Sequence, residues 1–167
     1  MDEVAATGRP LTFNGPLEAG VRAVAILGAA FPAAFDLERL TAFDYLIVRT
    51  QQLGGPEDLH PPVPIQTPAT EVRRKVVQDA LLLMMSRDLV ARESHPNGLR
   101  YRAGESAAFF LDSLQSPYLT TLKVRAEWLV QHLAGYSDDE FRALMRRLFD
   151  HWVVEFQNVE RSLGAIP

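Results

Sequence analysis

The stretch 70–114 constrains the fold most, because an Asn-Gly pair there separates two short segments that alternate like β-strands. These segments are Leu89–Glu93 and Leu99–Ala103, and the tetrapeptide His95-Pro96-Asn97-Gly98 joins them. Asn-Gly in this setting strongly favours a hairpin, since both residues tolerate positive φ. The sequence therefore predicts one two-stranded β-hairpin at about 89–103.

A helix is predicted on each side of this hairpin, over Glu71–Arg87 and Glu105–Leu114. On a helical wheel the first of them has an apolar side that should enter the core, whereas Leu82 falls among the polar residues opposite. The residues expected in the core are Val72, Val76, Val77, Ala80, Leu81, Leu83 and Met84. Helix, hairpin and helix in this order predict a winged-helix-like core.

Four further helices are predicted around that core. Asn14 and Asp36 are candidate N-caps for helices that reach Phe31 and Gln51. A C-terminal pair should cover Pro117–Leu133 and a longer amphipathic helix that starts at the capping box 137–140 and continues through Phe156. We thus expect a mostly α (α+β) fold, with a flexible tail over 1–12 and a single domain over 13–167.

The segment 53–69 has no periodicity and contains five prolines and two adjacent glycines. Structureless segments of this length are unusual inside a compact domain and tend to be functional or bound to a partner. In a standard winged helix a short helix would lie at this point, so we expect an extended loop to replace it.

Composition excludes several classes of protein. The 167 residues are 47% hydrophobic and 23% charged, as in ordinary globular proteins, and no apolar run approaches the roughly 20 residues that span a bilayer. The first residues lack the pattern of a secretory signal, so we expect a cytoplasmic protein that contacts no membrane. There is no cysteine, which excludes disulfides and thiolate metal sites.

No residue pattern in the chain indicates catalysis. The four histidines have no metal-ligand spacing, and nucleophile-elbow, P-loop and dinucleotide motifs are absent. The acids at 138–140 are explained by the favourable position of negative charge at a helix N-terminus. We therefore expect a protein that is not an enzyme and has no catalytic, cofactor-binding or metal-binding residues.

The basic charge is local. Residues 71–102 hold seven bases against four acids, whereas the formal net charge of the chain is −4. In a DNA-binding winged helix the third helix enters the major groove and the wing touches phosphate. The residues that would make such contacts are Arg74, Lys75, Arg92, Arg100 and Arg102. A solvated face, with Arg73 and Arg87 turned toward the core and paired with acids, and a protein-binding face are the alternatives.

A second group of residues is a candidate for contact with a protein partner. Trp128 projects off the apolar stripe of its helix, and tryptophan is enriched at interface hot spots. The candidates are Leu59, His60, Pro61, Leu82 and Trp128. The competing interpretation places Trp128 in the core, under the N-terminal helices.

Several segments, taken in order, resemble one known family over about residues 13–163. They are FNGPLEAGVRAVAIL (13–27), FPAAFDLERL (31–40), DYLIVRT (44–50), GGPEDLHPPVP (54–64), VRRKVVQDALLLMMSRDLV (72–90), NGLRYRAGE (97–105) and RAEWLV (125–130). The chain resembles a middle component of bacterial ABC-three-component systems, which overlap with the accessory subunit of Lamassu-type antiphage defence.

The resemblance implies a non-enzymatic subunit that bridges an SMC-like or Rad50-like coiled-coil ATPase and a separate effector, often a nuclease, with possible DNA contact inside the complex. The family brings no catalytic residues. The alternative is a stand-alone winged-helix DNA-binding transcriptional regulator, and the expected lack of a second helix counts against it.

Overall fold

The computed structural model describes residues 15–60 and 70–148. The predicted tail, Asn14, Pro61 and the last turns of the C-terminal helix lie outside these ranges. The described residues form six α-helices, one 3-10 helix and one two-stranded antiparallel sheet, which confirms the mostly α prediction. The elements are α2 (Pro16–Ala30), α3 (Leu37–Leu46), η2 (Thr50–Leu53), α4 (Thr70–Ser86), β1 (Val90–His95), β2 (Gly98–Ala103), α5 (Ala107–Ser113), α6 (Pro117–Leu133) and α7 (Asp138–Leu148).

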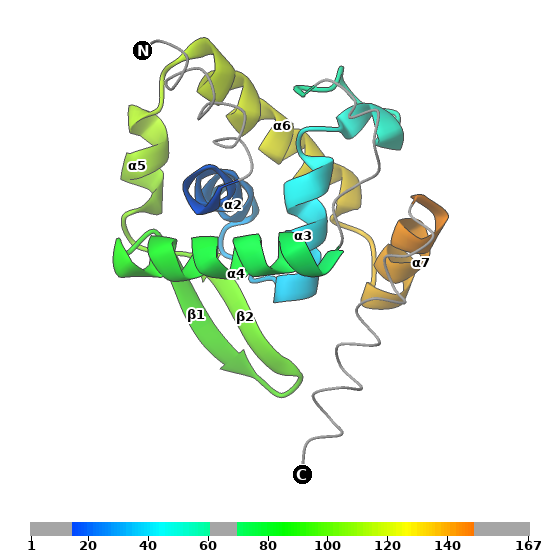
Figure 1. Cartoon of the computed structure of the whole chain (residues 1–167), viewed down its shortest axis with the longest axis horizontal. Helices are drawn as coiled ribbons and strands as arrows, with labels where there is room; N and C mark the ends of the chain where they lie inside the picture. The colour runs from blue at the N-terminus through cyan, green and yellow to red at the C-terminus, as the bar shows by residue number, and fades with distance from the viewer. Residues whose placement is uncertain (1–14, 61–69, 149–167) are drawn as a thin grey trace, which may run out of the picture.

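Helix α2 is the centre of the molecule, and Figure 1 shows it nearly end-on with α3, α4, α5 and α6 around it. Because these four helices surround it, α2 is buried around most of its circumference. Two of its glycines let neighbouring helices approach closely. A Cβ at Gly20 would collide with Met84 of α4, and one at Gly28 with Leu111 of α5. Phe31, at which the predicted helix ends, is the C-cap of α2 and is 63% exposed. The N-cap is Gly15 rather than Asn14.

Helix α3 is shorter than predicted. The carboxylate of Asp36 accepts a hydrogen bond of 2.8 Å from the backbone N–H of Arg39, which confirms the predicted N-cap. The helix ends at Leu46 instead of Gln51. The sequence that follows, Ile47-Val48-Arg49-Thr50, has three β-branched residues, which lose side-chain freedom in a helix. The chain turns there into η2, and the buried Thr50 hydroxyl donates to the carbonyl of Pro56 at 2.7 Å.

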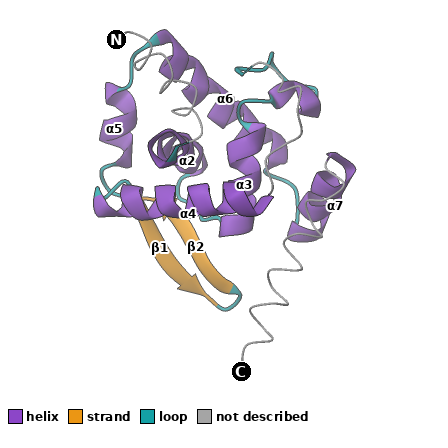
Figure 2. Ribbon diagram, viewed as in Figure 1, coloured by secondary structure: helices purple, strands orange, loops and turns teal. Residues whose placement is uncertain are grey.

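The predicted hairpin is present and extends from the helical body beneath α4 (Figure 2). His95 pairs with Gly98, so Pro96 and Asn97 are the two loop residues. Positive φ is required at Gly98 (+124°) and is not adopted by Asn97, which corrects the predicted role of the Asn-Gly pair. A bridge that the sequence analysis missed adds Phe35, between α2 and α3, to the outer side of β2 at Tyr101.

Helix α4 has nearly the predicted bounds, and its burial agrees with the helical wheel in most places. Val77, Ala80, Leu81 and Met84 are buried, and Leu82 is 53% exposed, as expected. Val72 is 58% exposed, contrary to the prediction. It lies in the first turn of α4, before the part of the helix that crosses α2 at Gly20 and Met84.

Phe43 joins the C-terminal helix to the core. Its ring meets those of Phe35 and Phe141 edge to face, at centroid distances of 5.2 and 5.6 Å. The predicted capping box at the start of α7 is confirmed, because Ser137 and Glu140 exchange hydrogen bonds of 3.0 and 3.1 Å between side chain and backbone.

Candidate interaction surfaces

The basic residues of the hairpin do not form one surface. The register places Arg92 opposite Tyr101, and Glu93 opposite Arg100. Successive residues of a strand point to opposite faces, so Arg100 and Arg102 share one face with Glu93 and Arg92 lies on the other. The guanidinium of Arg102 is 3.2 Å from the Glu93 carboxylate, which offsets part of the positive charge.

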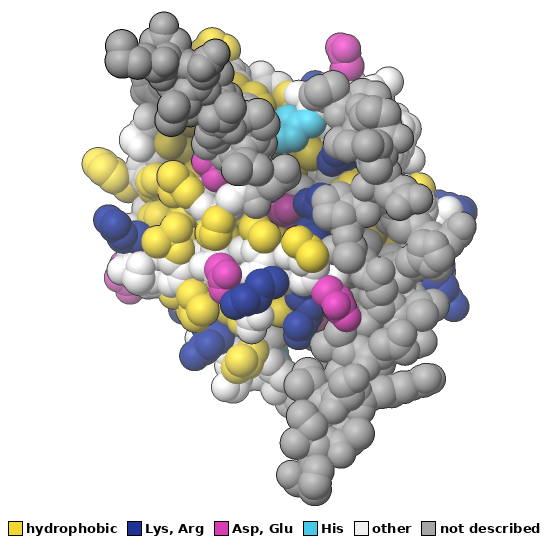
Figure 3. Space-filling view, in the orientation of Figure 1, with side chains coloured by type: hydrophobic (Ala, Val, Ile, Leu, Met, Phe, Trp, Pro, Cys, Tyr) yellow, Lys and Arg dark blue, Asp and Glu magenta, His cyan; other side chains and the backbone are white. Residues whose placement is uncertain are grey.

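The outward face of α4 is mixed in character. Lys75 pairs with Asp79 at 2.9 Å one turn later, and Arg74 is half-buried. Val72 and Leu82 are exposed beside them. Figure 3 shows this face, where hydrophobic side chains lie next to both acidic and basic ones. It therefore lacks the dominant positive charge that is typical of a helix that binds DNA.

The orientation expected for Arg73 is confirmed, but that for Arg87 is wrong. Arg73 is largely buried, and its guanidinium lies 2.9 Å from the carboxylate of Asp44. Arg87 is exposed. It comes after the last residue of α4, Ser86, so the helical wheel no longer determines its direction.

Asp44 of α3 is the acid of a buried ionic cluster that the sequence analysis missed. One carboxylate oxygen is 2.7 Å from Arg22 of α2 and the other is 2.9 Å from Arg73 of α4. Arg73 and Arg49 also lie over the ring of Tyr45, with their guanidinium carbons 5.0 and 4.5 Å from the ring centroid. The available signal was the position of Asp44, four residues after Leu40 on the apolar stripe of α3.

The described part of the Pro-rich segment lies along α6, in the opposite direction. The imidazole Nε2 of His60 is 2.7 Å from the Tyr118 hydroxyl, and the two rings stack. Arg125 donates to the carbonyl of Glu57 at 2.9 Å. The ring of Trp128 lies against Gly55 so closely that a Cβ at this glycine would collide with it. We call the segment 55–60 together with the facing residues of α6 the loop–α6 surface.

The loop–α6 surface contains a half-buried pair of titratable groups, His60 and Tyr118. Burial, and then the positive charges of Arg22 and Arg49, lower the pKa of the His60 imidazole. Burial raises the pKa of the Tyr118 phenol. Both shifts favour the neutral forms, so the two rings are joined by a hydrogen bond between neutral groups at physiological pH.

The candidate partner-contacting residues fall into two groups. Leu59, His60 and Trp128 belong to the loop–α6 surface, whereas Leu82 lies on α4, on the other side of α2. Trp128 is half-buried, and its ring stacks on that of His132 with the ring centroids 4.6 Å apart. It packs on the loop at Gly55 and also lies against the hydrophobic core.

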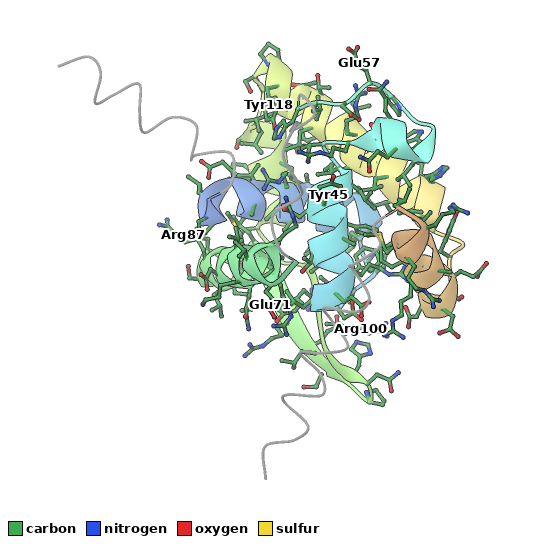
Figure 4. All side chains as sticks on the ribbon, turned by 45° about the vertical axis from the view of Figure 1, so that its right-hand side comes forward. Tyr45, Glu57, Glu71, Arg87, Arg100 and Tyr118 are labelled. Carbon is green, nitrogen blue, oxygen red and sulfur yellow. The ribbon has the colours of Figure 1, made fainter. Side chains whose placement is uncertain are left out.

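Figure 4 shows how far the candidate surfaces are separated in the molecule. The labelled Glu57 and Tyr118 mark the loop–α6 surface at one end, and Arg100 marks the hairpin at the other, with Tyr45 in between. Among residues 15–60 and 70–148, no three His, Asp or Glu side chains are placed to hold a metal ion. None of the described helices is long and apolar enough to cross a membrane.

Comparison with known proteins gives one family. No curated protein and no solved structure matches the chain. The family model described as ABC-three component (ABC-3C) system Middle Component 2 matches residues 12–155. This range covers most of the 167 residues, and the chain therefore belongs to the Middle Component 2 family of ABC-three component systems.

Proposed function

We propose that this chain is a non-enzymatic accessory subunit that links an SMC-like ATPase to an effector, such as a nuclease, in bacterial antiphage or anti-plasmid defence. The observation that carries the proposal is the family match over residues 12–155, which makes the chain one component of a three-component system. A middle component has two other components to contact.

The separation of the candidate surfaces supports a bridging role. The loop–α6 surface and the hairpin lie at opposite ends of the molecule in Figure 4, and α4 lies on the other side of α2 from α6 in Figure 1. Each offers side chains suited to protein contact, since the loop–α6 surface includes the half-buried Trp128 and α4 presents the exposed Leu82 and Val72. Two separated surfaces allow two partners to bind at once without competing.

A stand-alone winged-helix regulator of transcription is the second candidate, and the order of elements favours it. The elements follow the order of a winged helix. Helix α2 comes first, then the bridge residue Phe35, helices α3 and α4, and finally β1 and β2. In this interpretation α3 is the second helix, so the expectation that an extended loop replaces that helix does not count against a regulator. The mixed charge of α4 still favours protein contact over DNA contact.

Co-expression of this chain with the ATPase and the effector of the same three-component system tests the proposal. We expect the three proteins to elute as one complex in size-exclusion chromatography, and the ATPase and effector to separate when this chain is omitted. If the ATPase and effector co-elute equally well without it, the chain does not bridge them. A regulator would instead bind a DNA duplex as an isolated dimer, with an affinity that falls steeply with salt.

A further inference from the structure

A groove of about 670 Å³ opens where α2 ends against α5, α6 and the end of β2. We call it the α2–α5–α6 groove; Figure 2 shows the three helices around it. Small residues of α2, namely Ala25, Gly28 and Ala29, make its floor, and the exposed Ala108 of α5 lines its side. On its rim Phe31 and Val124 are exposed by 63% and 53%. Leu111 of α5 packs on Gly28 inside the groove, so the small residues around it leave room for apolar side chains of an occupant rather than for its backbone.

The rim of the groove is acidic in effect. Glu105, Asp112 and Glu127 line it and are exposed. Of the two bases that line it, Arg102 pairs with Glu93 at 3.2 Å. Lys123 donates to the carbonyl of Leu111 at 2.8 Å and keeps its positive charge, so three acids lie beside one base whose charge no acid in this lining offsets. Helix α2 also ends at the groove, and its last turn has no basic residue to offset the negative end of the helix dipole.

We propose that the α2–α5–α6 groove binds an amphipathic helix of a partner protein, with large apolar side chains facing the floor and lysine or arginine facing the acidic rim. Helices that dock in grooves use apolar anchors at positions i, i+3 or i+4, and i+7, and a volume of 670 Å³ accommodates several such side chains. The proposal rests on the proposed function only in assigning the helix to another component of the system.

A synthetic peptide provides the direct test. The probe is a fluorescein-labelled helical peptide of about 18 residues, long enough to form a helix, with leucines at those positions and flanking lysines. The matched probe has glutamate in place of each lysine. Fluorescence anisotropy with the full chain should show binding of the lysine peptide and at least about tenfold weaker binding of the glutamate peptide. Equal affinities, or no binding of the lysine peptide, would overturn the proposal.

Two arginine substitutions locate the binding site. Ala108→Arg places a long cationic side chain in the groove from an exposed position, and we expect it to weaken binding of the lysine peptide by about tenfold or more. Ala143→Arg makes the same change on the exposed side of α7 and should bind like the wild type. Circular dichroism checks that both variants are folded. The reverse pattern, or no effect of Ala108→Arg, would place binding elsewhere.

The complex separates the two proposals. If the wild type joins the ATPase and effector and Ala108→Arg joins them equally tightly, the groove proposal is wrong and the proposed function stands. If the wild type forms no complex, the proposed function is wrong, and the peptide measurements still decide whether the groove binds a basic helix. A homodimer that Ala108→Arg dissociates would identify a second copy as the occupant and would also overturn the groove proposal.

Discussion

The carboxylate of Asp44 lies between two buried guanidinium groups, with one oxygen 2.7 Å from Arg22 and the other 2.9 Å from Arg73. The three residues come from α3, α2 and α4, so the cluster ties together the central helix and two of its neighbours. Burying charge is costly unless each group is paired. Removing the Asp44 carboxylate should therefore lower the free energy of unfolding by more than the attraction within the ion pairs alone, because the desolvated guanidinium groups stay buried.

We predict that Asp44→Asn destabilises the chain by about 3–5 kcal/mol, because it removes a buried carboxylate that pairs with two guanidinium groups. Urea unfolding followed by circular dichroism measures the free energy of unfolding. Asp79→Asn is the matched control, since Asp79 pairs with Lys75 on the surface and should contribute less than about 1 kcal/mol. Equal losses for the two variants would show that the cluster has no special role.

His60 should make stability depend on pH. A histidine titrates near about 6.5 in an unfolded chain, and burial lowers the pKa of His60 in the folded protein. The folded state then binds this proton less readily than the unfolded state. The contribution of the neutral side chain is complete above pH 6.5 and is lost as the pH falls from there toward the folded pKa.

We predict that the wild type loses more stability than His60→Asn does when the pH is lowered from 7 to 5. Proton NMR titration of the imidazole of His60 should give a pKa below the ordinary value, and urea unfolding across the same range gives the stability. A pKa at or above the ordinary value would contradict the burial argument.

At the scale of single elements, the sequence predicts which helices and strands form better than it predicts where they end and what they contact. The hairpin followed from Asn97-Gly98 between alternating segments, and the capping box at Ser137 predicted the start of α7. These signals are local, because they depend on a few neighbouring residues. Helix α3 ends at Leu46, before the predicted end, because the apolar periodicity continues through Ile47 whereas the β-branched residues there disfavour a helix.

Contacts between distant residues were the part that sequence alone did not predict. The bridge from Phe35 to Tyr101 and the pairing of Asp44 with Arg22 depend on which elements become neighbours. The division of the hairpin arginines also required the register. For the candidate site, the sequence proposed the residues but could not indicate that Trp128 and His60 share one surface while Leu82 lies on another.

The contact between Gly55 and Trp128 gives a test of the loop–α6 surface. A Cβ at Gly55 would collide with the indole of Trp128, and His132 stacks on the same ring. We predict that Gly55→Ala displaces the indole and destabilises the chain by about 1–3 kcal/mol, as overpacking does. Thermal unfolding and tryptophan fluorescence report both effects. Gly135→Ala is the control, because nothing lies within 4 Å of its Cβ position; similar effects of both changes would contradict this contact.

At the scale of the whole molecule, a bridging subunit must bind two partners through separate surfaces, so that loss of binding at one leaves binding at the other unchanged. The loop–α6 surface and the outward face of α4 lie on different sides of α2, and each offers an exposed position for a charge change. Glu57 is exposed at the first surface and Leu82 is 53% exposed at the second. Neither side chain supports the core, so substitution there should leave folding intact.

We predict that Glu57→Lys and Leu82→Glu each weaken binding to one partner, and that the two variants affect different partners. Pairwise co-purification of each variant with the ATPase alone and with the effector alone measures this, with thermal unfolding to show that both variants are folded. The two positions lie on different sides of α2, so a change of charge at one surface does not touch the partner bound at the other. Loss of the same partner in both variants would mean that the two surfaces belong to one interface, and a bridge built on opposite ends would then be wrong.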